Sequence, residues 1–388
     1  MVSQRLYPYI AGAEQQALGL ARALTRADAD VRMVTTLFAD GLPRRETIDG
    51  IDVERIRVPL ARNVAEKGPA FHAAKISQIV TMALHVARAA RGVDIVHAHC
   101  LSASSLGAVI GARLAGVPVI VKPSLGGVDG ELRKLVVSAA SKPLLAMLRR
   151  VDRFAIMSEE IARELTDAGV APERFSAVDN GIDLDRFSPA SESERGVLRA
   201  RLGIPSGPVA LFVGQYVRRK GVRELLAAWS SVRERFPSAT LVLAGHGSEQ
   251  SAIDEAVRVP NGGVMDLGSR TDVVDVIRAA DLLVLPSRNE SFGNVIVEAL
   301  ACGLPVLVGR TGVATQLDLD GTAGRLIDPE SPASIADGLV EFLDDPERRA
   351  AAGVRGRELV RRYDFDRIAA TYLDIYGDMM SKRDQSRS

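Results

Sequence analysis

The sequence predicts an α/β protein made of two doubly wound domains, each with a parallel sheet covered by helices. Short apolar runs alternate with helical patterns along the chain, which is typical of parallel strands joined by crossover helices. The apolar runs are continuous, as expected for strands that are buried on both faces. At 388 residues the chain is also too long for one compact core and suits two domains of ordinary size.

The first half contains six apolar runs that are predicted strands: Val31–Thr35, Ile51–Ile56, Ile95–Ala98, Val117–Lys122, Phe154–Ile156 and Phe175–Val178. Helical patterns between them include Gly12–Leu24, Lys75–Ala90 and Ser102–Leu114. Only Met1–Ser3 remain for the first strand, which lies at the centre of a doubly wound sheet. Either the natural start lies upstream or this strand is very short, and a short strand would leave its neighbours with unpaired edges.

A second series of strands follows the Pro-, Ser-, Glu- and Gly-rich segment Ser188–Gly207. Its predicted strands are Val209–Val213, Ala239–Ala244, Val264–Leu267, Leu282–Pro286, Val306–Gly309 and Gly324–Ile327. We therefore expect an N-terminal domain over residues 1–187 and a C-terminal domain over residues 188–365. The helical pattern at the end of the chain, about residues 366–388, is expected to pack back on the first domain. Such sheets bind ligands beyond the carboxyl ends of their strands, so two that face each other would form a cleft.

The composition excludes some classes of protein. Lys and Arg number 49, as do Asp and Glu, so the chain lacks the basic surplus of a nucleic-acid binder. Cys100 and Cys302 lie far apart in apolar stretches, which favours two buried free thiols and a reducing, cytoplasmic location. The sequence shows neither a signal peptide nor an apolar run of about 18 residues that could span a bilayer.

The most informative stretch runs from Asp281 to Pro305. A predicted strand ends at Pro286, a polar loop follows, and a helix is expected to start near Gly293. A helix start carries free backbone N–H groups and the positive end of the helix dipole, which together favour a phosphate. Because Gly293 has no side chain, a ligand can approach the backbone there closely.

Glu298 lies inside this predicted helix and is the only charged residue between Phe292 and Gly309. A helical Glu usually lies on a solvated face, but this helix has no polar face to hold it. Burying an unpaired carboxylate in apolar surroundings costs roughly several kcal/mol of free energy, so the carboxylate needs hydrogen-bond partners. Sugar hydroxyls are suitable partners. Glu290, in the preceding loop, is a second carboxylate on the same side of the strand end.

The two glutamates have seven residues between them, within a P-S-x-x-E-x-F-G frame that is followed by E-A-L-A-C-G-L-P-V. This pattern resembles glycosyltransferase family 4. The resemblance implies the GT-B fold, in which two Rossmann-like domains face each other across a cleft, and a retaining transfer from a nucleotide-sugar. It also implies that Glu290 contacts the donor sugar ring, that the Phe292–Asn294 backbone meets the diphosphate, and that Glu298 holds the ribose hydroxyls.

Other segments resemble the same family in the same order. Asp179–Pro189 resembles its N-G-I-D-x-x-x-F-x-P turn, and Val213–Gly221 its V-G-R-x-x-x-x-K-G loop. Leu243–Gly247 resembles a G-x-G strand end that borders the base, and Tyr7–Glu14 a P-x-x-G-G-x-E loop near the phosphates. The donor-binding residues implied by these matches are Gly12, Gly214, Gln215, Arg219, Lys220, Gly245, Gly247, Glu290, Phe292, Gly293, Asn294, Val295 and Glu298.

Lys220 and Glu290 are the predicted catalytic residues. Negative charge grows on the leaving diphosphate during transfer, so a fixed cation such as Lys220 lowers the barrier. The family pattern has Arg at the position where this chain has the neutral Gln215. Either Arg218 or Arg219 takes over the phosphate contact of that Arg, or both lie in a solvated loop.

We predict no metal and no cofactor. A metal-dependent sugar transferase typically carries D-x-D directly after an apolar strand. The D-x-D triplets of this chain do not follow a strand in that way: Asp28/Asp30, Asp183/Asp185 and Asp318/Asp320. Lys220 and the helix start can together supply the charge that Mg²⁺ would otherwise provide.

His99, Ser124 and Gly126 are the acceptor-side candidates. Asp94–His99 resembles the family's D-V-V-H-x-H strand end, where a His is either structural or a sugar contact. Many relatives carry His-Gly after the next strand, whereas this chain has Pro-Ser-Leu-Gly-Gly there. The acceptor itself is unidentified and is a glycan, a lipid-linked sugar or a small molecule.

Several alternatives stay open. The basic residues Arg133, Lys134, Lys142, Arg149 and Arg150 flank apolar ones, so this segment is either a surface that meets anionic lipid or a helix pair broken at Pro143. The favoured function is transfer of a UDP- or GDP-linked hexose, with possible contact to the inner face of the membrane. A catalytically weak nucleotide-sugar-binding protein and a sugar-nucleotide epimerase are the competing functions.

Overall fold

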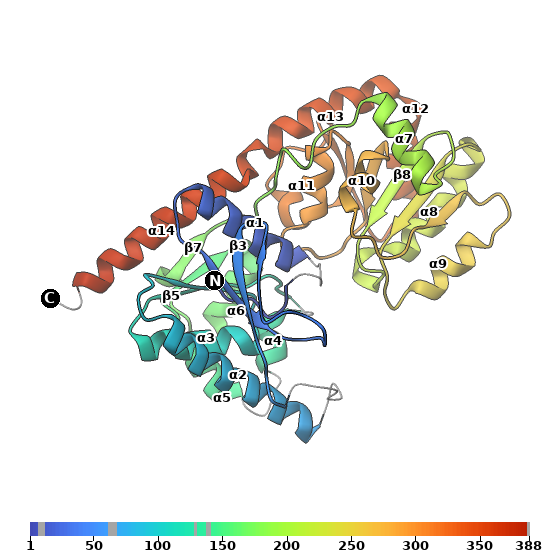
Figure 1. The fold of residues 1–388 in the computed structure, drawn as a ribbon. Helices are drawn as coiled ribbons and strands as arrows, with labels where there is room; N and C mark the ends of the chain where they lie inside the picture. The colour runs from blue at the N-terminus through green and yellow to red at the C-terminus, as the bar shows by residue number, and fades with distance from the viewer. Residues whose placement is uncertain (7–11, 61–67, 128–129, 137–140, 386–388) are drawn as a thin grey trace. The chain divides into compact units, whose positions relative to one another are not determined.

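The computed structural model describes residues 1–6, 12–60, 68–127, 130–136 and 141–385. The chain forms two compact units: unit 1 comprises Met1–Gly181 and Phe365–Ser388, and unit 2 comprises Ile182–Asp364. Each unit contains parallel strands connected through helices (Figure 1), which confirms the predicted α/β class.

Unit 2 contains a fully parallel six-stranded sheet in the order β10-β9-β8-β11-β12-β13. Its strands are β8 (Val209–Val213), β9 (Thr240–Ala244), β10 (Val264–Asp266), β11 (Leu282–Leu285), β12 (Val306–Gly309) and β13 (Gly324–Ile327). The first strand of the unit is therefore central, and the winding direction reverses between β8 and β11. We call this place the switch point, and it is where doubly wound sheets bind ligands.

Each of the six strands predicted for unit 2 is present. Helices and short turns connect these strands. The helices are α7 (Glu192–Leu202), α8 (Val222–Arg235), α9 (Gln250–Val257), α10 (Val273–Arg278), α11 (Asn294–Ala301), α12 (Pro332–Asp344) and α13 (Pro346–Val360), with 3-10 turns η2 (Arg218–Lys220), η3 (Gly312–Thr315) and η4 (Arg361–Tyr363). The central strands β9, β11 and β12 are buried along their whole length, because helices cover both faces.

Unit 1 contains strands β1 (Arg32–Thr36), β2 (Arg45–Ile48), β3 (Ile51–Ile56), β4 (Val96–His99), β5 (Val119–Lys122), β6 (Arg153–Ile156) and β7 (Phe175–Ala177). They pair as β1-β3-β2 and as β4-β5-β6-β7. Strand β2 was not predicted from the sequence; it pairs antiparallel with β3 through a two-residue turn. That turn is Asp49-Gly50, with φ of 50° and 83°, and Asp-Gly is the dipeptide that favours such a hairpin.

The N-terminal segment joins the two groups of strands. Val2 forms parallel bridges with both Val34 and Ala98, so it lies between β1 and β4. Its N–H donates to the carbonyl of His97 at 2.7 Å, and its carbonyl accepts from the N–H of His99 at 2.8 Å. The central strand of this sheet is thus short, and backbone hydrogen bonds of Met1–Ser3 satisfy the edges beside it.

The helices of unit 1 are α1 (Gly12–Arg26), α2 (Pro69–Ala89), α3 (Ala103–Ala115), α4 (Glu131–Val136), α5 (Ser141–Leu148), α6 (Glu159–Asp167) and α14 (Phe365–Gln385), with the turn η1 (Pro172–Arg174). Two helices occupy the basic segment, as one of its two alternatives expects, but the second helix begins before Pro143, which lies in the first turn of α5. Proline is tolerated there, since the first N–H groups of a helix have no partner within it.

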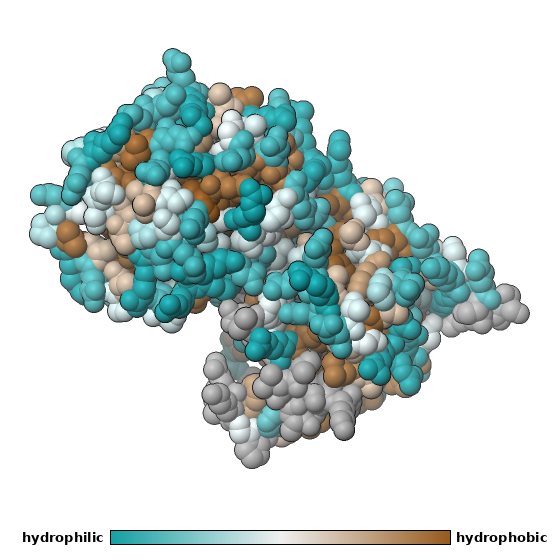
Figure 2. All heavy atoms as spheres, turned by 180° about the vertical axis from the view of Figure 1, so that it is seen from behind, coloured by the Kyte–Doolittle hydropathy of each residue, from teal (hydrophilic) through white to brown (hydrophobic). Residues whose placement is uncertain are grey.

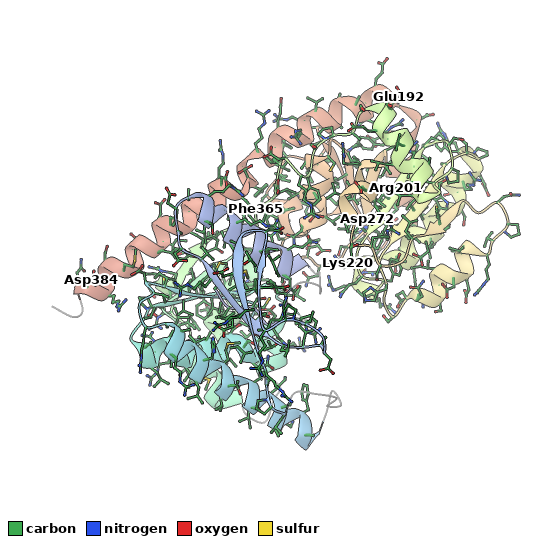
Figure 3. The ribbon with its side chains drawn as sticks, in the orientation of Figure 1. Glu192, Arg201, Lys220, Asp272, Phe365 and Asp384 are labelled. Atoms are coloured by element: carbon green, nitrogen blue, oxygen red, sulfur yellow. The ribbon has the colours of Figure 1, made fainter. Side chains whose placement is uncertain are left out.

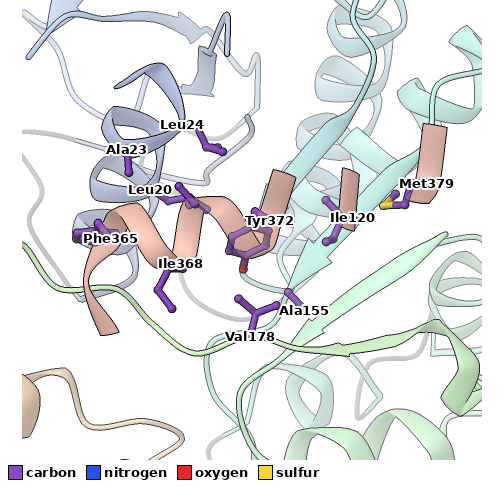
Figure 4. Close-up of a cluster of buried hydrophobic side chains, with 11 residues drawn as sticks. Leu20, Ala23, Leu24, Ile120, Ala155, Val178, Phe365, Ile368, Tyr372 and Met379 are labelled. Carbon is purple, nitrogen blue, oxygen red and sulfur yellow. The ribbon is translucent and has the colours of Figure 1, made fainter. Parts of the chain in front are cut away.

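Helix α14 packs on unit 1 through a cluster of buried apolar side chains, shown in Figure 4. These side chains come from α1, from the sheet and from α14 itself: Leu20, Ala23, Leu24, Ile120, Ala155, Val178, Phe365, Ile368, Ala369, Tyr372 and Met379. Phe365 lies against two glycines. A Cβ added to Gly19 or to Gly181 would come within 2.2 Å of its ring, so both positions must lack a side chain.

Replacing Phe365 by Ala is expected to lower the free energy of unfolding by about 3 kcal/mol, because the ring leaves a cavity between α1 and the chain at Gly181. Urea unfolding followed by circular dichroism measures this change. The control is Val354→Ala, at a side chain that is 66% exposed, which should change stability little. A Phe365→Ala variant as stable as the control would contradict this packing account.

Candidate active site

Lys220 and Glu290 meet at the switch point of unit 2. Lys220 ends the turn η2 in the loop after β8, and Glu290 lies in the loop after β11; Lys220 is labelled in Figure 3. The Lys220 Nζ donates a hydrogen bond to the Glu290 Oε1, and both side chains are largely buried. The two predicted catalytic residues therefore form a buried ion pair at the carboxyl edge of the sheet.

Backbone and side-chain hydrogen bonds hold these two loops together. The Arg219 carbonyl accepts from the Arg288 N–H at 2.8 Å, and the Arg219 Nη1 donates to the Asn289 carbonyl at 3.1 Å. Gly221 follows Lys220 with φ of 71°, and a Cβ there would lie 2.1 Å from the Pro286 carbonyl oxygen. The loop after β8 can approach β11 this closely only because that residue is glycine.

Thr311 and Gly312, in the loop after β12, support the Glu290 loop from a third strand end. The Thr311 Oγ1 accepts a hydrogen bond from the Glu290 N–H at 2.9 Å. A Cβ on Gly312 would lie 2.4 Å from the Phe292 carbonyl oxygen. Thr311 was not predicted from the sequence, because no local pattern shows that it contacts a residue 21 positions earlier.

Helix α11 begins at Asn294, with Gly293 as its N-cap in the left-handed region at φ of 90°. No side chain caps this helix start. A helix start without a side-chain cap, here beside Glu290, suits an anionic group. Phe292 is buried, and its ring packs edge-on against Tyr363 at 5.5 Å between centroids.

Glu298 lies one turn further along α11. Its side chain is half-buried, and its carboxylate has no hydrogen bond or ion pair among the residues that the structure describes. Burial raises the pKa of this carboxyl to about 7, and the charge of Arg186 opposes the shift. A carboxylate held without a partner in this way can accept hydrogen bonds from ligand hydroxyls.

Gly245 and Gly247 allow the loop after β9 to pack on the loop after β8. A Cβ on Gly245 would lie 1.9 Å from the Gly214 carbonyl oxygen, and one on Gly247 would lie 2.4 Å from the Tyr216 carbonyl oxygen. Tyr216 is fully buried, and its hydroxyl donates to the Asp266 Oδ1 at 2.7 Å. These contacts explain the two glycines through packing, whether or not they also border a base.

Substituting Ala for Gly245 is expected to displace the Gly214 loop and to cost about 2 kcal/mol of stability. Because Gly214 lies beside the Lys220 side chain, donor affinity should fall as well. Urea unfolding and nucleotide titration measure the two effects. Gly196→Ala is the matched control, since a Cβ in α7 meets nothing within 4 Å and should stabilise the helix slightly. Equal behaviour of the two variants would contradict the close approach.

Three side chains are candidates for the place of the Arg in the family pattern, and they differ in exposure. Gln215 and Arg218 are exposed, whereas Arg219 is half-buried and contacts the loop that carries Glu290. Of these three side chains, Arg219 is therefore the one that the structure brings to the Lys220–Glu290 pair. Gly12 belongs to unit 1, where it begins α1, and the rest of the predicted segment before it, residues 7–11, lies outside the described residues.

The acceptor-side candidates form a second group, in unit 1 at the ends of β4 and β5. Ser124 donates a hydrogen bond to the Oε1 of Glu131, whose Oε2 accepts from the N–H groups of Leu101 at 2.7 Å and Ser124 at 3.1 Å. Burial raises the pKa of Glu131, and these hydrogen bonds oppose the shift. Glu131 was missed by the sequence analysis, because it carries no motif and acts through the loop it organises.

His99 is buried at the end of β4 and stacks on His97, with ring centroids 4.4 Å apart. Burial, followed by the charge of Lys122, holds the pKa of His99 well below its usual value. The Nδ1 of His97 and the hydroxyl of Tyr376 on α14 form a hydrogen bond of 2.6 Å. These contacts give the pair a structural role beneath α14. Gly126 packs against α6, where an added Cβ would lie 3.0 Å from Ile161.

The described residues contain neither a candidate metal centre nor a candidate membrane span. Within those ranges, His, Cys, Asp and Glu side chains do not gather in any group of three or more that could hold a metal ion. No helix among the described residues is long and apolar enough to cross a bilayer. Metal independence stays a prediction.

Comparisons with known proteins identify the family. Residues 11–181 match the family described as "Glycosyl transferase 4-like domain", and residues 195–359 match "Glycosyl transferases group 1". The D-inositol 3-phosphate glycosyltransferase of Salinispora arenicola is 30% identical over 392 residues, covering 94% of this chain and 86% of that protein.

Solved structures show the same fold over nearly the whole chain. The sucrose-phosphate synthase of Thermosynechococcus elongatus matches with a TM-score of 0.78 and 22% identity, covering 98% of this chain and 99% of that one. The Anabaena protein HepE, in complex with UDP and glucose, matches with a TM-score of 0.74 and 21% identity over 97% and 98%. The chain therefore belongs to the group 1, family 4-like glycosyltransferases, and it is a nucleotide-sugar glycosyltransferase with the GT-B fold.

Proposed function

We propose that the chain is a retaining hexosyltransferase that moves a hexose from UDP or GDP to an acceptor hydroxyl. The observation that carries the proposal is the unpartnered carboxylate of Glu298, on the helix whose uncapped start adjoins the Lys220–Glu290 pair. A nucleoside diphosphate sugar has the matching groups in the matching order: a ribose diol, a diphosphate and a hexose with several hydroxyls.

Two features support the proposed roles. The Lys220 ammonium has three donors and gives one to Glu290, so it can also donate to a diphosphate oxygen. The N–H groups at the start of α11 favour the same diphosphate. Glu290 then accepts from a hexose hydroxyl while it keeps Lys220 in place, and Glu298 accepts from the ribose diol.

In the proposed reaction, the bond between the anomeric carbon and the diphosphate oxygen breaks, and the diphosphate takes the electron pair. Lys220 and the α11 dipole stabilise the charge that grows there. The acceptor oxygen attacks from the face that the diphosphate leaves, and a diphosphate oxygen takes its proton. The proposal involves no covalent nucleophile on the protein and no metal ion.

The proposed donor draws on the UDP and glucose bound to HepE. The proposed acceptor is a broader class of molecules. The curated relatives are named for inositol 3-phosphate, but at 30% identity that acceptor is not carried over. We propose a hydroxyl of a glycan, a lipid-linked sugar or a small molecule, reached in the cytoplasm.

The proposal is tested by donor turnover with the full chain. UDP-glucose, UDP-galactose, UDP-N-acetylglucosamine, GDP-mannose and ADP-glucose are each added, and the shift in Tm and the slow hydrolysis of the donor are recorded. We expect one UDP- or GDP-sugar to raise Tm by mass action. Proton NMR taken before mutarotation should show release of the α-anomer from an α-linked donor. Release of the β-anomer, or no Tm shift with any of the five, would contradict the proposal.

A second candidate, a protein that binds the donor but turns it over weakly, rests on Gln215. This neutral, exposed residue occupies the place of an Arg in the family pattern. Under this alternative the Tm shift appears without hydrolysis or transfer to acceptors from cell extracts, and Gln215→Arg should then restore turnover.

A further inference from the structure

Arg357 of α13 binds backbone carbonyls that belong to two different segments of unit 2. Its Nη1 donates to the carbonyl of Ala301, the last residue of α11, and to that of Phe187, the latter at 3.0 Å. Its Nη2 donates to the carbonyl of Leu184 at 3.2 Å. A planar guanidinium holds several acceptors at once in a fixed geometry. Arg357 therefore joins the end of α11 to the segment 184–187.

Close packing of α13 on α11 supports this junction (Figure 1). A Cβ on Gly353 would lie 2.0 Å from the Gly303 carbonyl oxygen, and one on Gly356 would lie 2.6 Å from the Leu300 Cδ2. The chain just after the segment also meets this end of α11, since a Cβ on Gly303 would lie 3.3 Å from the Pro189 Cγ. The segment is thus held at the end of α11 by packing as well as by hydrogen bonds.

Arg186 is the basic residue of the segment 184–187. Its side chain is exposed, and its guanidinium carbon lies 5.5 Å from the centre of the buried Phe187 ring. Hydrophilic residues cover much of the face of the molecule drawn in Figure 2, so exposure alone gives an arginine no particular role. The place of Arg186 does distinguish it, because its charge acts on the carboxylate of Glu298, about one turn before the end of α11.

Other charged or titratable groups near this end of α11 act on a different side chain. Arg278 on α10 and Arg357 on α13 act on the thiol of Cys302, the C-cap residue of α11. Burial and then the charge of Glu298 raise the pKa of Cys302 to about 12, so this thiol stays neutral. Among the described residues, Arg186 is therefore the cation that acts on the Glu298 carboxylate.

We propose that Arg186 is a further residue of the donor site, which keeps the Glu298 carboxylate ionised for the ribose diol, and that Arg357 positions Arg186 for this task. This role rests on the proposed function, because it requires that Glu298 binds the ribose. A carboxyl in apolar surroundings keeps its proton to higher pH unless a cation stands beside it. Arg186 and Glu298 lie far apart in the chain, so a fixed junction is needed to keep them together.

Loss of the Arg186 charge should raise the pKa of Glu298 further above its ordinary value, so that less of this carboxyl is ionised at neutral pH. The experiment is calorimetric titration of the full chain with UDP and GDP from about pH 6 to about pH 9. The wild-type affinity should rise through this range. Arg186→Gln should bind about two- to fivefold more weakly at about pH 7 and equally well at about pH 9, because solvent screens an exposed cation.

Two comparisons isolate the contribution of the carboxylate. The profile of Glu298→Gln is subtracted from each of the others, because the phosphate of the nucleotide also titrates. Arg186→Lys keeps the charge and should restore the wild-type profile. A loss of affinity in Arg186→Gln that Arg186→Lys does not restore would show that charge is not what Arg186 supplies, and would overturn the proposal.

A double variant separates a charge that acts through Glu298 from a direct contact with the nucleotide. Adding Arg186→Gln to Glu298→Gln should change the affinity by less than about twofold, because the carboxylate on which Arg186 acts is already gone. A loss in the double variant as large as that caused by Arg186→Gln alone, and equal at every pH, would assign Arg186 to the ligand itself and overturn its role beside Glu298.

Arg357→Lys tests the positioning step. Lysine has a compact ammonium and cannot hold the carbonyls of both segments in one plane, so the profile should shift to higher pH as it does in Arg186→Gln. The matched control is Arg355→Gln, at an exposed arginine of the same helix that pairs with Glu358, and it should bind as the wild type does. A wild-type profile in Arg357→Lys would remove Arg357 from this role. If Arg357→Lys does not fold, the Arg186 variants still test the proposal.

Failure of this proposal can be told apart from failure of the proposed function. A wild-type profile identical to that of Glu298→Gln would contradict the ribose role of Glu298, and the role of Arg186 would be lost with it. A wild-type profile that rises with pH, and on which the profile of Arg186→Gln superimposes, would overturn the role of Arg186 alone.

Discussion

Replacing Glu298 by Gln is expected to weaken binding of a nucleoside diphosphate by at least about tenfold, because two hydrogen bonds to a charged group become neutral ones. The side chain keeps its shape, and in the absence of ligand its carboxylate has no partner among the described residues that the change could break. Isothermal titration with UDP and GDP measures the loss. The control is Glu192→Gln, an exposed glutamate in the first turn of α7, which should bind as the wild type does.

The same substitution should affect stability in the opposite direction. Burial raises the pKa of Glu298 to about 7, so between its ordinary value of 4.5 and 7 the folded protein keeps a proton that the unfolded chain has released. The free energy of unfolding therefore falls as pH rises through that window. At pH 8 the Gln variant should be more stable than the wild type by at most about 3 kcal/mol. A variant that loses both affinity and stability would contradict this account.

The pH dependence of donor binding follows from the same carboxyl group. Ribose hydroxyls are held by the ionised form, so the affinity of the wild type should rise as pH increases from about 6 to about 8. In Glu298→Gln this part of the pH profile should be flat. Titrations at three pH values with one nucleotide are sufficient, and identical profiles in the two proteins would contradict the assignment.

Replacing Lys220 by Ala is expected to lower kcat by about 10² to 10³, with a much smaller change in donor affinity. The ammonium acts mainly on charge that grows as the diphosphate leaves, so its loss affects the transition state more than the bound ground state. Steady-state kinetics and nucleotide titration measure the two quantities. Arg218→Ala is the control, because Arg218 is an exposed cation of the same loop. Equal kcat values for the two variants would remove Lys220 from the mechanism.

Lys220→Ala should also destabilise unit 2, because it leaves the buried carboxylate of Glu290 unpaired. Breaking a buried pair costs about 3 kcal/mol or more, and removal of the second charge recovers part of that cost. Lys220→Ala combined with Glu290→Gln should thus be more stable than Lys220→Ala alone. If the two are equally stable, the ion pair does not explain the loss.

The sequence predicted the parallel strands well, because strands buried on both faces are continuous apolar runs. β2 was not predicted, because none of its residues is buried and its only signal is the Asp49-Gly50 turn. The placement of Met1–Ser3 between β1 and β4 could not be derived, because it depends on pairing with strands more than 30 residues away. Pro143 does not itself mark the end of a helix, because proline is also tolerated in the first turn of one.

For the site, the sequence predicted Glu298 from a local property, the absence of any other charge near it. The family pattern predicted Lys220 and Glu290, and the fold explains their meeting, since the loops after β8 and β11 flank the switch point. Thr311 and Glu131 could not be found in this way, because each accepts a hydrogen bond from the backbone of a loop 21 or 30 positions earlier in the chain. The sequence likewise could not show which of Gln215, Arg218 and Arg219 lies at the Lys220–Glu290 pair. The hydrogen bond from Arg219 to the Asn289 carbonyl shows this only in the structure.

The central claim is that the Glu298 carboxylate holds the ribose hydroxyls of a nucleotide-sugar. The most direct test is to titrate the wild type and Glu298→Gln with the preferred nucleoside diphosphate and with its 2′,3′-dideoxy analogue. The wild type should bind the parent nucleotide at least about tenfold more tightly than the analogue, and the variant should bind both equally weakly. Equal affinity of the wild type for the two ligands would contradict the claim.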